Sequence, residues 1–125
     1  RPTNAASTAF EATRIKPDSK RAWLLTSRLQ HEAGMSLAEI ETLEMLSKLD
    51  AKYAAEYLQQ TATLQFQLNQ IEQAFETLER IFALPTATLK HYQIAASFCL
   101  QIKKADQAVE ILRRATRIFP RDRSA

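Results

Sequence analysis

Glycine is almost absent from this chain of 125 residues. Average usage would supply about nine glycines at this length, yet Gly34 is the only one. Tight hairpins and phosphate-cradling loops depend on the positive φ angles that glycine adopts readily. The sequence therefore argues strongly against a hairpin-rich β protein, a P-loop and a glycine-rich dinucleotide-binding turn.

Cysteine and long apolar runs are also scarce. The single cysteine, Cys99, excludes a disulfide within the chain and a cysteine-cluster zinc site. No uninterrupted apolar run approaches the roughly 18 residues that span a bilayer, so we expect no membrane insertion by this chain. The net charge of +3 is too small by itself to indicate nucleic acid binding.

Neither these absences nor the start of the chain fixes its compartment, which stays open between periplasm and cytoplasm. The sequence shows no signal peptide and begins with Arg1 rather than methionine. It reads as a piece of a longer protein, from which targeting information is missing.

Helix-forming residues dominate what is present. Ala, Leu, Gln, Glu, Lys and Arg fill almost every window, and apolar residues recur at steps of three and four. Pro17, Pro85 and Pro120 each follow an apolar face and should close a helix. Ser36 with Glu39 matches a capping box, which predicts the start of a further helix.

A repeat of about 34 residues runs through this helical pattern. Large residues recur at Trp23, Leu58 and Tyr92, at intervals of 35 and 34 residues. Small or apolar residues match at the same period, namely Ser27, Ala62 and Ala96, then Ala74 and Ala108, Ile81 and Ala115, and Leu84 and Ile118. The N-terminal Ala5, Ala12, Ile15 and Pro17 have the spacing of Ala108, Ala115, Ile118 and Pro120.

Pairs of antiparallel helices explain this period. Two helices joined by a short turn approach closely where both carry small side chains, as Ala62 with Ala74 and Ala96 with Ala108 would. The large residue at the start of each pair would fill the gap to the next pair. One pair cannot bury its apolar face alone, so the pairs must stack.

At this point the sequence resembles the tetratricopeptide repeat (TPR) family, which alternates A and B helices over 34 residues. Residues 22–34, AWLLTSRLQHEAG, are similar to its A helix, and residues 108–120, AVEILRRATRIFP, to the end of its B helix. The resemblance implies an all-α, right-handed α-solenoid of antiparallel helix pairs. It comprises an N-terminal half-repeat at 1–18 and three repeats at about 19–52, 53–86 and 87–120.

The chain departs from the family pattern at several positions, and other α-solenoids remain the alternative. Ser27, Ala62 and Ala96 replace the usual glycine of the A helix, and Asn69 and Lys103 replace a second glycine that survives as Gly34. Asp50 and Ala51 stand where the first repeat would have its proline, so we expect an irregular boundary there.

Candidate catalytic groups are few, and we expect no enzyme, cofactor or metal. His31 and His91 are far apart and lack a carboxylate or cysteine partner at ligand spacing. Cys99 lies within an apolar run, which indicates buried packing rather than a nucleophile. Glu39, Glu41 and Glu44 are interpreted as a solvated helix face, because paired acids for acid–base work would need a pocket.

The resemblance points instead to a concave groove lined by A helices, which binds a protein or peptide partner. Carried over residue by residue, it predicts a groove made of Arg21, Leu24, Arg28, His31, Gln59, Thr63, Phe66, Gln67, Lys90, Gln93, Ser97, Leu100 and Gln101. The family's clamp for a terminal carboxylate is largely absent, since its slots hold residues such as Leu24, Gln59 and Thr63. Phe66 and Leu100 are predicted as apolar anchors; the alternative is that neighbouring helices partly cover both.

Charge is distributed unevenly, at +3 over residues 1–35, −6 over 36–79 and +6 over 80–125. The basic end, with Arg113 and Arg117, is a second candidate surface, although a solvated face beside a following repeat explains it more simply. We predict a non-enzymatic protein-interaction scaffold. Family resemblance alone extends this to bacterial envelope or polysaccharide export assemblies. The alternative is a structural spacer, or a module that associates with itself through exposed solenoid ends.

Overall fold

The computed structural model describes residues 2–16 and 18–120 of the chain. Helical residues fill nearly all of this range, as the composition predicts. The α-helices are α1 (Pro2–Ile15), α2 (Lys20–Glu32), α3 (Ser36–Leu49), α4 (Ala54–Gln67), α5 (Ile71–Phe82), α6 (Leu89–Gln101) and α7 (Ala105–Ile118). These two ranges contain no strand.

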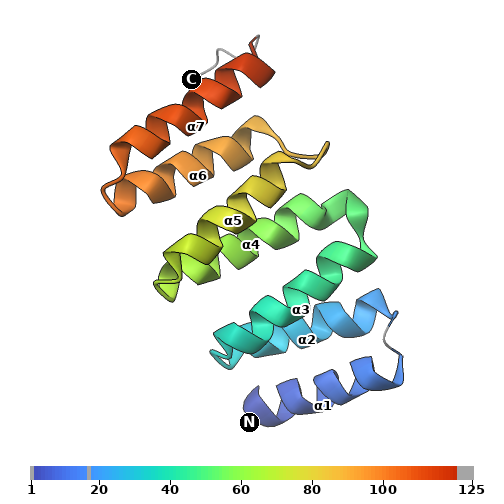
Figure 1. The fold of residues 1–125 in the computed structure, drawn as a ribbon. Coiled ribbons are helices and arrows are strands. Elements are labelled where there is room, and N and C mark those ends of the chain that lie inside the picture. Colours follow the sequence, from blue (N-terminus) through green and yellow to red (C-terminus); the bar gives the residue numbers. More distant parts are fainter. Residues whose placement is uncertain (1, 17, 121–125) are drawn as a thin grey trace.

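The helices stack in chain order along one direction, with α1 and α7 at opposite ends of the stack (Figure 1). Successive helices run antiparallel through short turns. The predicted all-α solenoid of helix pairs is therefore confirmed.

Three turns within this stack share one backbone conformation. Gly34, Asn69 and Lys103 have positive φ angles of 72°, 62° and 62°. In each turn the next N–H donates to a carbonyl five residues earlier, as from Met35 to Gln30 at 2.9 Å. This is the left-handed helix ending that glycine favours, so Asn69 and Lys103 do occupy the turn positions that the repeat assigned to them.

The connection between α3 and α4 is irregular, as expected at Asp50 and Ala51. A 3-10 turn, η1 (Ala51–Tyr53), joins the two helices. Lys20 Nζ lies 2.5 Å from Asp50 Oδ2, which ties the start of α2 to the end of α3. This hydrogen bond lowers the pKa of Asp50, and it gives the junction a polar contact where other repeats have proline.

The helix start predicted at Ser36 is confirmed, but the capping box of Ser36 with Glu39 does not form. Ser36 is the first residue of α3 and Met35 precedes it as the capping residue, with no side-chain hydrogen bond to the helix. The Glu39 carboxylate contacts His31 instead. Of the prolines, Pro85 and Pro120 follow the ends of α5 and α7 as predicted, and Pro17 lies outside the described residues.

A side-chain cap does occur at the start of α6. The backbone N–H of Thr88 donates to Nδ1 of the buried His91 at 2.9 Å. Burial lowers the pKa of His91 below its ordinary value of 6.5; Glu56 acts in the opposite direction, and Lys90 lowers the pKa further. The folded chain therefore holds this ring neutral, as its role as an acceptor requires.

Acid should therefore weaken the fold through His91, because the unfolded ring takes up a proton more readily than the folded one. The contribution is fully present above about pH 6.5 and is lost as pH falls towards the lower folded pKa. His91→Gln keeps an acceptor that does not titrate. Between about pH 7.5 and 5.5, its unfolding free energy in urea should fall less than that of the parent, by at most about 1.4 kcal/mol per pH unit. An equal fall in both proteins would contradict this assignment.

Large and small residues are buried where the repeat places them. Trp23, Leu58 and Tyr92 are all buried. The Tyr92 ring stacks on Phe82 of the preceding helix at 4.2 Å, and Trp23 meets Phe10 of α1 edge-on at 6.3 Å. The large residues at Trp23 and Tyr92 thus fill the gap to the preceding helix. The small residues at the proposed close contacts, Ala62, Ala74, Ala96 and Ala108, are buried too.

Two hydrogen bonds, one buried and one partly buried, cross helix pairs at equivalent places. The Thr42 hydroxyl donates to Gln30 Oε1 at 2.7 Å, and the Thr77 hydroxyl donates to Gln65 Oε1 at 2.6 Å. The third pair has Cys99 and Ile111 at the matching positions, both buried without this bond. These bridges were not among the sequence predictions, although the 35-residue interval between the two Gln–Thr pairs was an available signal.

Candidate binding groove

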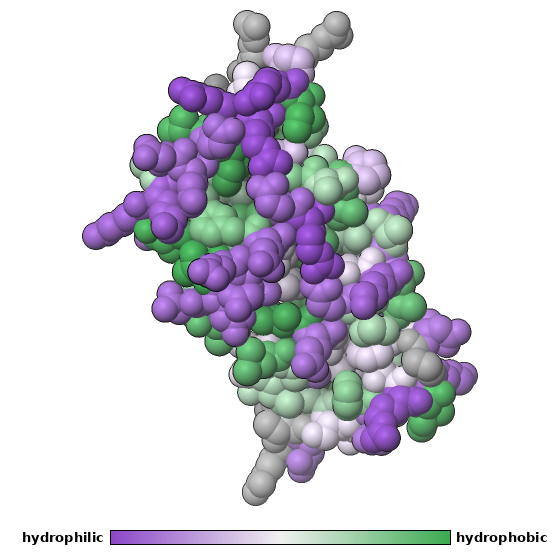
Figure 2. Space-filling view, viewed as in Figure 1, coloured by the Kyte–Doolittle hydropathy of each residue, from purple (hydrophilic) through white to green (hydrophobic). Residues whose placement is uncertain are grey.

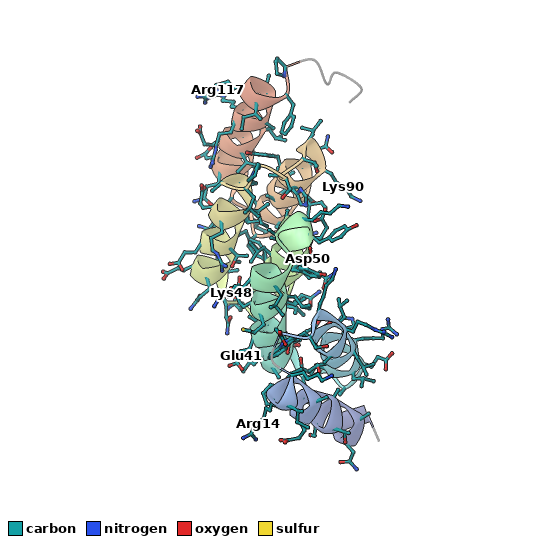
Figure 3. All side chains as sticks on the ribbon, turned by 90° about the vertical axis from the view of Figure 1, so that its right-hand side faces the viewer. Arg14, Glu41, Lys48, Asp50, Lys90 and Arg117 are labelled. Carbon is teal, nitrogen blue, oxygen red and sulfur yellow. The ribbon has the colours of Figure 1, made fainter. Side chains whose placement is uncertain are left out.

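All thirteen predicted groove residues lie on the even-numbered helices α2, α4 and α6. Viewed from the side, α5 and α7 occupy one layer, while α2 and α6 occupy the other (Figure 3). The labelled side chains follow this division, since Arg117 of α7 and Lys90 of α6 point to opposite sides. In this view α2 and α6 therefore present a surface separate from that of α5 and α7.

A hollow of about 540 Å³ lies on this surface between α2, α3 and α4. Five of the predicted groove residues line it: Leu24, Arg28, His31, Thr63 and Gln67. Five further residues complete the lining and were not predicted as groove residues: Ser27, Glu32, Glu39, Gln60 and Leu64. Apolar Leu24 and Leu64 are half-buried and buried, whereas Arg28, His31 and Glu32 are exposed, so the hollow combines an apolar lining with polar side chains.

The remaining predicted residues on α6 form an exposed strip beyond this hollow, made of Lys90, Gln93, Ser97, Leu100 and Gln101. Leu100 is 59% exposed and is the apolar member of this strip. Arg21 is also exposed but does not line the hollow.

Phe66 and Gln59 do not face an open groove, contrary to the sequence prediction. The Phe66 ring stacks on Phe98 at 4.7 Å and meets Phe75 edge-on at 5.7 Å. Phe66 is half-buried, with rings from α5 and α6 packed against it. This agrees with the alternative, in which neighbouring helices partly cover the residue. Both amide atoms of Gln59 are buried and have no hydrogen-bond partner in the part of the chain that the structure describes. Spacing alone could not separate these inward positions from outward ones one helical step away.

The prediction that Glu39 belongs to a solvated helix face is wrong. Glu39 is 5% exposed and lines the hollow. Its two carboxylate oxygens each lie 3.1 Å from Nδ1 of His31, whose side chain is 70% exposed. Glu41 is exposed as predicted, and Glu44 is half-buried in an ion pair.

Repeat position explains why this carboxylate was missed. Ala74 and Ala108, the small residues of the later B helices, align with Glu39 at intervals of 35 and 34 residues. Both alanines are buried. A glutamate at a position that is otherwise alanine was the signal in the sequence, once the three B helices are aligned.

Arginine–glutamate ion pairs link successive odd-numbered helices. Arg80 of α5 pairs with Glu44 of α3 at 2.6 Å, and Arg114 of α7 pairs with Glu79 of α5 at 2.8 Å. Hydrophilic side chains cover much of the face in Figure 2, with apolar residues between them. Exposed pairs of this kind stabilise a fold only weakly, so we assign them to alignment of the helices.

Both histidines have a carboxylate neighbour, contrary to the sequence prediction. His31 Nδ1 lies 3.1 Å from Glu39, and His91 Nε2 lies 3.9 Å from Glu56, contacts that sequence spacing does not reveal because they join different helices. Cys99 is fully buried, and this burial raises the pKa of its thiol. Within residues 2–16 and 18–120, no three His, Cys, Asp or Glu side chains gather in a way that could hold a metal ion. Among the helices described, none is long and apolar enough to cross a bilayer.

Two solved structures titled as MamA are similar in fold. The first aligns with a TM-score of 0.71 at 16% identity, covering 95% of this chain and 64% of that chain. The second aligns with a TM-score of 0.67 at 20% identity, covering 92% of this chain and 67% of that chain. No family model and no curated protein matches the sequence. The likeness therefore shows the fold alone, a solenoid of stacked helices.

Proposed function

We propose that this chain is a TPR array that acts as a non-enzymatic scaffold for a protein or peptide partner. In this proposal α1 is the trailing half-repeat, and the three repeats are α2 with α3, α4 with α5, and α6 with α7. Arrays of this kind present extended surfaces rather than enclosed pockets. The fold shared with TPR-like proteins supports the scaffold class.

The observation that carries the proposal is the surface of the even-numbered helices. It carries a hollow of about 540 Å³ between α2, α3 and α4, and an exposed strip on α6 that contains Leu100. An exposed apolar side chain among amides can anchor a peptide while the amides bond to its backbone. We extend this proposal to a role in a bacterial envelope or polysaccharide export assembly on the ground of family resemblance alone.

Leu100→Ala should weaken capture of the partner by about 1–2 kcal/mol, as truncation of an apolar anchor does. The measurement is a pull-down from the source cell, followed by titration of the captured protein. Leu37→Ala is the matched control, because Leu37 is 63% exposed on α3 and does not line the hollow. Loss of binding in the control but not in Leu100→Ala would contradict the proposed groove.

The second candidate function is a spacer that associates with itself through its ends. The observation in its favour is the apolar surface of α7, where Val109, Leu112 and Ile118 are 46%, 43% and 53% exposed. Leu43 and Leu78, which align with Leu112, are both buried. Light scattering after size-exclusion chromatography tests this candidate: the parent should form oligomers that Leu112→Ala dissociates.

A further inference from the structure

We propose that the hollow between α2, α3 and α4 takes a basic side chain of the partner, held by the buried carboxylate of Glu39. This inference rests on the proposed function and names the chemistry that the groove selects. It starts from the burial of a charged group at a place where the fold does not need one.

The fold requires only a small residue at this position. Glu39 aligns with Ala74 and Ala108, which are both buried at the same place in later helix pairs. Transfer of a carboxylate out of water is costly unless the charge is paired and hydrogen-bonded. A glutamate therefore carries a penalty here that alanine avoids, and a role in binding accounts for it.

The carboxylate also keeps capacity for another donor. Its one partner among the described residues is His31, whose Nδ1 lies 3.1 Å from each of the two carboxylate oxygens. A carboxylate can accept about four hydrogen bonds. Since Glu39 lines the hollow, this remaining capacity is available to a group that enters it.

The lining of the hollow fits a long basic side chain. Leu24 and Leu64 offer apolar contact to the methylene groups, while Thr63 and Gln67 add polar atoms. At the rim, Arg28 and Glu32 are both exposed and carry opposite charges one helical turn apart. They offset each other, so the buried Glu39 decides the charge that the deep part accepts: a lysine or arginine is attracted and a carboxylate is repelled.

Selection of peptides on the immobilised chain tests the proposal. A phage-displayed library of random linear peptides should yield sequences that share a lysine or arginine. A synthetic copy should then lose about tenfold or more of its affinity for Glu39→Gln, in titration calorimetry. Glu41→Gln is the matched control, since Glu41 is an exposed carboxylate on the same helix outside the hollow, and it should bind as the parent does. When the peptide's basic residue is replaced by norleucine, Glu39→Gln should cause no further loss.

A stability measurement separates this role from a structural one. Glu39→Ala removes a buried charge and leaves behind His31, whose side chain is mostly exposed. The urea midpoint of this variant should therefore equal or exceed that of the parent, whereas a structural carboxylate would lower it.

Three outcomes would overturn the proposal: selected peptides without a common basic residue, equal affinity for the parent and Glu39→Gln, or a lower urea midpoint in Glu39→Ala. If Leu100→Ala weakens partner capture and Glu39→Gln does not, the result supports the groove and contradicts the proposed site for a basic side chain. If neither variant weakens capture of the partner, the result contradicts the proposed function as well.

Discussion

Replacing Trp23 with alanine should cost about 3–5 kcal/mol of unfolding free energy, as truncation of a buried tryptophan typically does. Trp23 packs with Leu43, Leu46 and Leu64 in a cluster that joins α2, α3 and α4. A separate cluster, which includes Tyr92 and Ala108, holds α4 to α7 together. Because stability in a repeat array passes between neighbours, the loss should concentrate in the first helix pair.

Hydrogen exchange measured by mass spectrometry checks this distribution. Amides of α2 and α3 should exchange faster in Trp23→Ala, and those of α6 and α7 should change less. Leu25→Ala is the control, because Leu25 is 48% exposed on the same helix and its loss should stay within about 0.5 kcal/mol. Exchange that accelerates equally at both ends of the chain would contradict the division into two clusters.

Ala96→Leu should destabilise the third helix pair by about 1–3 kcal/mol through overpacking. Ala96 is 3% exposed and belongs to the buried cluster that also contains Ala95, Cys99 and Ala108. A leucine there adds three carbon atoms where the surrounding side chains leave no room. Urea denaturation gives the free energy directly.

Ser97→Leu is the matched control, because it enlarges the adjacent residue, which is exposed on α6. Its effect should stay within about 0.5 kcal/mol. Equal destabilisation by both substitutions would mean that the assignment of inward and outward positions on α6 is wrong.

The helical architecture follows from the sequence because it depends on local preference and period. Near absence of glycine, abundant helix formers and large residues at Trp23, Leu58 and Tyr92 are enough to predict stacked helix pairs. Turn chemistry is equally local: the positive φ at Gly34, Asn69 and Lys103 falls where the period places it. The burial of Ala62 and Ala96 follows for the same reason, since close approach of two helices demands small side chains.

Side-chain direction was decided only by the tertiary structure. Phe66 and Leu100 are one period apart, yet Phe66 is stacked between neighbouring rings and Leu100 is exposed. Both occupy matching helix positions, so the difference comes from Phe98 and Phe75, which reach Phe66 from other helices. Glu39 shows the reverse case: its residue type indicated solvent, but its place at a helix contact buries it beside His31. A sequence period fixes where a residue lies on its own helix, whereas exposure depends on what the adjoining helices bring against it.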